Sequence, residues 1–320
     1  KVSGAVQAAL WTSLPEDLGY IYSFNGPHSL FADTIRSLRS LAVAYQLGHV
    51  LMGERDQKLN LLHRLLTHAE TTARFNVYFG NGRDAYDVRG RVAQESIFNI
   101  HDGSYRCPSS QQGCSPISTW TRGLAWILLG YAEELEFLET LPPAAFKPQW
   151  DKKRVIKRFL DVAGAVADYF IQETPTDGVP YWDTGAPGLV HMGDYRNRPA
   201  NPFNEYEPVD SSAAVIAAQG FVRLGKYQLA KGDKKSGHRY FSAGLTIART
   251  VFDEPYLSTN QHHQGLILHS IYHRPKGWDY IPSKSKIPRG ESSMWGDYHA
   301  RELGLLILRI AQGKPYYRFW

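Results

Sequence analysis

The chain has 320 residues, of which 43% are hydrophobic and 21% charged, with a formal net charge of +5 and a sequence pI near 9.0. This length and apolar content can fill a sizeable core, which excludes a chain that is disordered throughout. The positive residues are scattered and form no basic run interleaved with aromatic residues, so the charge fits a small anionic ligand better than a nucleic acid.

Apolar residues recur at helical spacing in the segments 30–51, 59–78, 119–138, 155–170, 211–224, 240–251 and 294–311. The alternation typical of strands is weak everywhere, so the sequence predicts an all-α protein. Two long loops rich in Gly, Pro, Asn and Asp, at 80–116 and 174–208, separate helices, and loops of such length usually have a function. No run of about 18 apolar residues is present, and we expect no membrane partner.

Four of the predicted helices share one design, in which a charged residue at or near the start precedes a small or apolar body. These residues are Asp33, Arg122, Asp210 and Asp297, and they recur at intervals of 87–89 residues. Such a period indicates repeated helix pairs. We therefore expect a double-layered helical toroid whose inner helices start at one functional rim, with Asp210 acting mainly as a helix cap and Asp297 as a rim or capping residue.

Six landmarks in chain order resemble the unsaturated glucuronyl hydrolases and their relatives, the unsaturated rhamnogalacturonyl hydrolases. They are LFADTIRSLRSLAVAYQLG, HAETT, STWTRGLAW, PYWD with EPVDSSAAVIAA, HRP and MWGDY, and the resemblance covers about residues 20–312. The family folds as an (α/α)6 barrel, of which this chain supplies about four inner helices. The resemblance thus implies one catalytic domain, 1–320, that lacks the first helices of the barrel.

The resemblance maps the family's general acid/base onto Asp33. Hydration of the C4=C5 enol ether of an unsaturated uronate needs a proton at C4 and a water directed to C5, and one carboxyl can serve both steps. The hemiketal that forms would open spontaneously and release the rest of the oligosaccharide. The alternative is that Asp33 only caps its helix.

Arg122 and Trp126 stand four residues apart, so on a helix they share one face and offer a cation beside a stacking surface. The resemblance maps both onto substrate contacts, and the Arg fork suits a carboxylate. The alternative is that Arg122 pairs with a buried Asp and Trp126 fills the core. Trp295 is expected to line the same rim. Where the family usually has Gln, this chain has Leu124.

The resemblance also places His68 and His101 among the residues that line the site. Asp102 stands in NIHDGSY where relatives commonly show His-Gln-Gly, so it is a second acid/base or lies outside the sugar pocket. Asp17 superficially matches a second essential Asp of the family but precedes Asp33 by only 16 residues. The basic stretch 283–289 is interpreted mainly as a solvated loop.

No nucleotide loop, nucleophile elbow or metal-ligand pair is present in the sequence, so we expect no metal and no cofactor. Cys107 and Cys114 form a disulfide in an oxidising compartment or remain two free thiols, and the location, cytoplasmic or periplasmic/secreted, stays open. The expected partner is an oligosaccharide that carries an unsaturated uronate. The alternatives are an unsaturated rhamnogalacturonyl hydrolase, an ordinary glycosidase with two opposed carboxylates, and a non-catalytic carbohydrate-binding toroid.

Overall fold

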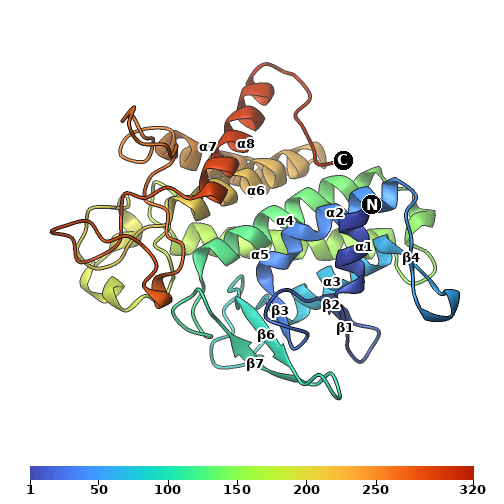
Figure 1. Cartoon of the computed structure of the whole chain (residues 1–320). Coiled ribbons are helices and arrows are strands. Elements are labelled where there is room, and N and C mark those ends of the chain that lie inside the picture. The colour runs from blue at the N-terminus through green and yellow to red at the C-terminus, as the bar shows by residue number, and fades with distance from the viewer.

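Two layers of paired helices form the body of the molecule in a computed structural model that describes residues 1–320, apart from the side chain of residue 54 (Figure 1). Within the described chain the α-helices are α1 (Val2–Ala9), α2 (Arg39–Gln46), α3 (Leu61–Phe75), α4 (Thr121–Thr140), α5 (Lys152–Glu173), α6 (Ser211–Ala230), α7 (Lys234–Val251) and α8 (Met294–Ala311). A 3₁₀ helix, η1 (Ala32–Leu38), leads directly into α2.

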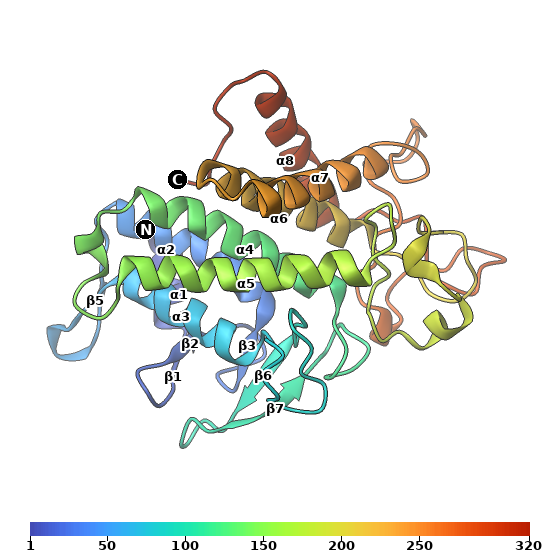
Figure 2. The ribbon, with the colours of Figure 1, turned by 180° about the vertical axis from the view of Figure 1, so that it is seen from behind.

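The inner layer consists of η1 with α2, α4, α6 and α8. α4 contacts η1 on one side and α6 on the other, and α6 contacts α8. Both α4 and α6 are buried around almost their whole circumference, whereas α5 and α7, which pair with them from outside, bury one face (Figure 2). The expectation of an all-α, double-layered barrel is therefore confirmed.

Small residues let these helices approach closely, as the small or apolar bodies of the predicted helices indicate. A Cβ on Gly220 of α6 would lie 2.9 Å from the backbone nitrogen of Leu129 in α4. A Cβ on Gly225 would lie 2.5 Å from the backbone nitrogen of Phe241 in α7. Both distances are too short for real carbon contacts, so each glycine is required where α6 crosses a neighbour.

Short strands decorate the helical body, and the sequence did not predict them. They are β1 (Trp11–Ser13), β2 (Gly19–Ile21), β3 (Ser29–Phe31), β4 (Leu51–Met52), β5 (Lys58–Leu59), β6 (Glu95–Phe98) and β7 (Tyr105–Ser109). They pair antiparallel as β1-β2, β3-β6-β7 and β4-β5. Strands of two to five residues contain too few alternations to show a period of two.

The predicted helix 30–51 is consequently wrong in its limits, because β3 precedes it, η1 forms its first part and β4 follows it. The pairing of β3 with β6 sets Phe31 opposite Glu95, and the backbone N–H of Ala32 donates to the carbonyl of Gln94 at 2.8 Å. The long loop 80–116 is thereby fixed to the start of the first inner helix.

A buried ion network joins the inner helices away from these helix starts. Glu133 of α4 accepts from Nε of Arg39 at 2.8 Å and lies 3.2 Å from Nε of Arg36. Arg223 of α6 lies 3.7 Å from Glu133 and donates to Glu136 at 2.7 Å. Arg36 also lies 3.4 Å from Glu302 of α8, so three arginines meet three glutamates and the network binds the inner elements together. None of the helices in the described residues is long and apolar enough to cross a membrane.

Candidate active site

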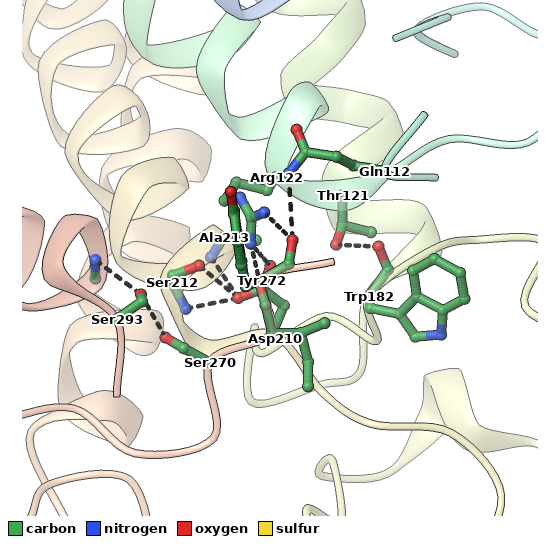
Figure 3. Close-up of polar contacts among 12 residues, drawn as sticks. Gln112, Thr121, Arg122, Trp182, Asp210, Ser212, Ala213, Ser270, Tyr272 and Ser293 are labelled. Atoms are coloured by element: carbon green, nitrogen blue, oxygen red, sulfur yellow. Dashed lines mark hydrogen bonds and ion pairs between the residues drawn. The ribbon is translucent and has the colours of Figure 1, made fainter. Parts of the chain in front are cut away.

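The first turns of α4, α6 and α8 meet at one end of the barrel, which we call the rim (Figure 3). Arg122 of α4 lies 3.0 Å from Asp210, the N-cap residue of α6. The indole N–H of Trp295 in α8 donates to the hydroxyl of Ser212 in α6 at 3.0 Å. Helix starts carry partial positive charge on their backbone N–H groups, so this end of the barrel favours an anionic ligand.

Arg122 is held at the centre of the rim by three acceptors. Its Nη1 donates to Asp210 and to the carbonyl of Ile271, and its Nη2 donates to the carbonyl of Tyr272 at 2.8 Å. The side chain is only 3% exposed, and burial lowers its pKa although Asp210 opposes the shift. The pairing with a buried Asp that the sequence left open is present. These acceptors take three of the five guanidinium N–H donors, which leaves two for a ligand.

Asp210 has a second task, because its Oδ1 accepts from the backbone N–H of Ser212 at 3.0 Å and of Ala213 at 3.3 Å. The predicted helix cap is therefore confirmed for this residue. Asp297 does not cap α8, whose N-cap is Ser293. Its carboxylate instead accepts from the backbone N–H groups of Leu266 and Ile267, both at 2.9 Å, and fixes the preceding loop.

Two glutamines connect the rim to β6. The Oε1 of Gln94 accepts from the backbone N–H of Gln112 at 2.8 Å, and the amide of Gln94 donates to the side chain of Gln112 at 3.3 Å. Gln112 donates in turn to the carbonyl of Tyr272 at 3.2 Å, the same carbonyl that binds Arg122 (Figure 3). The loop before α4 and the loop before α8 thus share one acceptor beside Arg122.

Asp33 approaches this group from the first turn of η1, which packs against α4. The N-cap residue of η1 is Phe31, with no side-chain cap hydrogen bond, so the alternative that Asp33 caps its helix does not match the structure. Its Oδ1 is buried and has no hydrogen-bond partner among the described residues. Burial raises the pKa of Asp33 to about 6, with a further rise from Glu95, while its own backbone N–H and Arg122 oppose the shift.

Asp183 is a buried carboxylate with a structural role, and it serves as a comparison for Asp33. Burial also raises its pKa to about 6. However, Oδ2 of Asp183 accepts from the backbone N–H of Cys114 and Oδ1 from that of Gly185, each at 2.8 Å. Both oxygens are engaged in holding loops, whereas Asp33 keeps a free oxygen. Of these two protonatable carboxyls, only Asp33 is available to exchange a proton with a ligand.

Glu95 is a second carboxylate near Asp33 that the sequence did not suggest. It is 2% exposed, and its Oε1 accepts from the hydroxyl of Ser29 at 3.2 Å and from the amide of Asn25. Burial raises its pKa, although the hydrogen bonds from Ser109 and Ser29 oppose the shift. Its effect on Asp33 is electrostatic, and it favours the protonated form of that carboxyl.

Aromatic rings surround the guanidinium of Arg122. Its Cζ lies 4.9 Å from the ring centre of Trp295 and 4.5 Å from that of Trp120. Trp126 lies one turn further along α4, partly buried against the core, with its ring edge-on to His299 at 5.1 Å. Trp295 is thus part of the rim, whereas Trp126 mainly packs inside the barrel below it.

The structure does not bring every sequence-predicted residue to the rim. His68 has no exposed surface, and its Nδ1 accepts from the backbone N–H of Ile21 at 3.0 Å. Burial lowers the pKa of His68 to about 3, so the ring is neutral and joins β2 to α3. A substrate contact does not fit a ring in this position.

His101 and Asp102 lie in the exposed turn between β6 and β7. The carboxylate of Asp102 accepts from the backbone N–H of Ser104 at 2.8 Å, and the hydrogen bonds from Ser104 lower its pKa. The turn is at the end of β6 remote from Glu95, about 10 Å or more along the strand, so neither residue joins Asp33. Asp17 lies in the exposed turn between β1 and β2 with a φ of 56°.

Cys107 and Cys114 are both free and exposed, so the disulfide left open by the sequence is absent. Within the described residues no cluster of three or more His, Cys, Asp or Glu side chains has the geometry of a metal site. The rim therefore offers one protonatable carboxyl, one cation, polar amides and aromatic rings, which together suit a negatively charged sugar.

Comparison with known proteins connects this geometry to a family, although no family model matches the chain. The unsaturated glucuronyl hydrolase of Bacillus sp. (strain GL1) is 27% identical over 221 residues, which are 69% of this chain and 48% of the relative. The crystal structure of an unsaturated glucuronyl hydrolase from Bacillus sp. GL1 superposes with a TM-score of 0.67 at 22% identity, covering 98% of this chain and 68% of that one. The chain is related to the unsaturated glucuronyl hydrolases.

The unsaturated chondroitin disaccharide hydrolase of Streptococcus agalactiae serotype III (strain NEM316) is 26% identical over 197 residues, 60% of this chain and 38% of the relative. The chain thus spans about half the length or less of these curated relatives. The shared fold with an unsaturated glucuronyl hydrolase covers nearly the whole described chain, so the two helical layers follow that barrel.

Gln112 is a rim residue that the sequence analysis did not identify. The sequence comparison sought the His-Gln-Gly of relatives at 101–103, which the structure places in an exposed turn. Gln111, Gln112 and Gly113 stand just before α4, and Gln112 lies at the rim. Ten residues separate Gln112 from Arg122. The short spacing to an already identified arginine was the signal that could have located it.

Proposed function

We propose that this chain is a glycoside hydrolase that removes a Δ4,5-unsaturated uronate from lyase-generated oligosaccharides. The observation that carries the proposal is Asp33, a carboxyl with a raised pKa and an unpartnered buried oxygen beside the cation of Arg122. The relation to unsaturated glucuronyl hydrolases and to an unsaturated chondroitin disaccharide hydrolase supports it. A purely carbohydrate-binding barrel would have no use for a protonatable carboxyl at this place.

The chemistry proceeds as a hydration. Asp33 transfers its proton to C4 of the enol ether, and positive charge develops on C5 and the ring oxygen. Water adds to C5 and returns a proton to the Asp33 carboxylate, which gives a hemiketal. The bond between C5 and the ring oxygen then breaks to form a ketone, and the hemiacetal left at C1 releases the leaving-side sugar as an alcohol. One water is consumed, and Asp33 ends in its starting state.

The rim would bind the uronate through the carboxylate of the sugar. Arg122 keeps two N–H donors beyond those used by Asp210, Ile271 and Tyr272. A carboxylate that receives charge-assisted hydrogen bonds from a fixed guanidinium is well oriented. The helix starts of α4, α6 and α8 add positive potential. The role of Arg122 is thus to position the sugar so that C4 faces Asp33.

The test follows the enol-ether absorbance of unsaturated disaccharides in the presence of the protein. We expect the wild type to remove the absorbance and Asp33→Asn to reduce the rate by about a hundredfold or more. Asp233→Asn is the matched control, because Asp233 is an exposed N-cap of α7 outside the rim, and this variant should retain the wild-type rate.

Two outcomes contradict the proposal. A wild-type protein that leaves the absorbance of every unsaturated disaccharide unchanged is not such a hydrolase. A folded Asp33→Asn variant with a near-normal rate removes Asp33 as the acid, and Glu95→Gln then becomes the informative variant.

A further inference from the structure

Three aromatic rings form a continuous row that leads outward from Arg122, and we call Trp295, Tyr272 and Trp278 the aromatic row. The guanidinium carbon of Arg122 lies 4.9 Å from the ring centre of Trp295. The ring centres of Trp295 and Tyr272 are 5.2 Å apart, and those of Tyr272 and Trp278 are 5.5 Å apart. Exposure increases along the row, from a partly buried Trp295 to 47% for Tyr272 and 60% for Trp278.

Hydrogen bonds hold the row in place without a ligand. Arg122 binds the carbonyls of Ile271 and Tyr272, which fixes one end of the loop (Figure 3). The carboxylate of Asp279 accepts from the backbone N–H of Tyr272 at 2.5 Å and from that of His273 at 3.0 Å, which closes the loop behind Trp278. The ring of His273 supports Trp278 at a centre distance of 4.9 Å. An ordered aromatic surface loses little freedom when a ligand binds.

Exposed rings of this number in one loop require an explanation, since proteins seldom leave large contiguous apolar patches on the surface. Tyr280 and Ile281, with exposures of 58% and 46%, extend the patch beyond Trp278. Both oxygens of Asp279 already accept backbone N–H groups, and Lys276 contributes a cation beside His273. The patch therefore combines apolar rings with one neutralised carboxylate and one nearby cation, so its charges do not repel a polyanion.

We propose that the aromatic row is a binding site for the sugars on the leaving side of the oligosaccharide, with Trp278 as its outer stacking surface. The proposal rests on the function proposed above, because it starts at the uronate position beside Arg122. The ring centres lie 5.2 and 5.5 Å apart at tilts of 49° and 38°, so the three rings form one connected, curved apolar surface. The apolar faces of sugar rings stack on aromatic side chains. The site thus selects oligosaccharides longer than a disaccharide.

The experiment compares two unsaturated substrates made by a lyase from the same unsulfated chondroitin, a disaccharide and a tetrasaccharide. We expect the wild type to have a higher kcat/KM for the tetrasaccharide. Trp278→Ala should lower kcat/KM for the tetrasaccharide by about 10-fold, mainly through KM, and by a smaller factor for the disaccharide. Tyr86→Ala, at another exposed aromatic residue outside the row, should leave the ratio of the two substrates unchanged.

The outcomes separate this inference from the proposed function. If both substrates are consumed and Trp278→Ala affects them equally or not at all, the aromatic row is not a sugar site, whereas the hydrolase function stands. If neither substrate is consumed, the proposed function fails, and titration of the tetrasaccharide into wild type and Trp278→Ala decides the inference alone. Weaker binding by the variant then supports a sugar site, and equal or absent binding overturns it and leaves the patch to a protein partner.

Discussion

Replacing Asp210 with Asn tests whether the rim is built on a buried ion pair. Asp210 has no exposed surface and lies 3.0 Å from Nη1 of Arg122, which is itself 3% exposed. Asn keeps the size of Asp and is as good an N-cap, so the hydrogen bonds to the first turn of α6 remain. The substitution therefore removes one negative charge and replaces the Oδ2 acceptor that faces Arg122 with an amide donor, while the cap is kept.

The expected cost comes from the cation that stays behind. Removing one partner of a buried ion pair typically destabilises a protein by about 3–5 kcal/mol, because the other charge is left uncompensated in the interior. At an unfolding entropy of about 2.1 cal/mol/K per residue, each kcal/mol lowers Tm of a 320-residue protein by about 1.5 °C, so Asp210→Asn should melt roughly 5–8 °C below the wild type. The carbonyls of Ile271 and Tyr272 still accept hydrogen bonds from the Arg122 guanidinium in the variant. The destabilisation should therefore lie at the lower end of the range expected for a broken buried ion pair.

The assay is thermal unfolding at neutral pH with two comparison variants. Asp233→Asn makes the same substitution at the exposed N-cap of α7, and its Tm should stay close to that of the wild type. Arg122→Met combined with Asp210→Asn removes both charges and should recover part of the lost Tm. If Asp210→Asn has the same Tm as Asp233→Asn, the ion pair with Arg122 does not stabilise the fold. The ion-pair account would then be refuted, and Arg122 would serve ligand binding only.

Three further predictions concern titration and packing. Because the folded protein raises the pKa of Asp33 to about 6, stability falls as the pH rises from about 4 to 6, so the Tm of Asp33→Asn relative to wild type should increase over that interval. Burial alone would raise the pKa of Glu133, but Arg36 and Arg39 hold that pKa below its usual value. Glu133→Gln should therefore lower Tm at pH 7. The difference in Tm between the variant and the wild type should become smaller as the pH falls below about 4. Gly90→Ala, at a φ of 89° and with its Cβ 2.1 Å from the carbonyl oxygen of Ala165, should cost about 3 kcal/mol or more, whereas Gly82→Ala, at a φ of 78° with nothing within 4 Å, should cost about 1 kcal/mol in denaturant unfolding. Equal costs for the two glycines, or pH-independent differences for the two carboxyls, would contradict these arguments.

Helical periodicity was sufficient to predict the helical layers because their apolar faces repeat over four or more turns. The segment 294–311 coincides with α8, and the start of α6 at Ser211 was predicted from the VDSSAA pattern that places its cap. Periodicity failed where tertiary pairing decides the structure. Leu30 and Phe31 were assigned to a helix but lie in β3, which pairs with β6, a partner 64 or more residues away that local propensity does not reveal.

The candidate site divides in the same way. The interval between Asp33 and Arg122 follows from the repeat of helix pairs, so both were predictable as inner-helix residues near one rim. His68 was not, because nothing in HAETT distinguishes a ring that accepts a backbone N–H in the core from one that faces a ligand. Glu95, Gln94 and Tyr272 lie on short strands and loops, and only the folded chain brings them to helix starts.

The most direct test of the central claim uses an unsaturated uronate joined to its leaving-side sugar by a carbon–carbon bond at C1. Hydration at C4 and C5 does not break a bond to C1, so the wild-type protein should still remove the enol-ether absorbance of this analogue, and Asp33→Asn should not. An enzyme that consumes the natural disaccharide but leaves the carbon-linked analogue intact would act at the anomeric carbon, which would contradict hydration by Asp33.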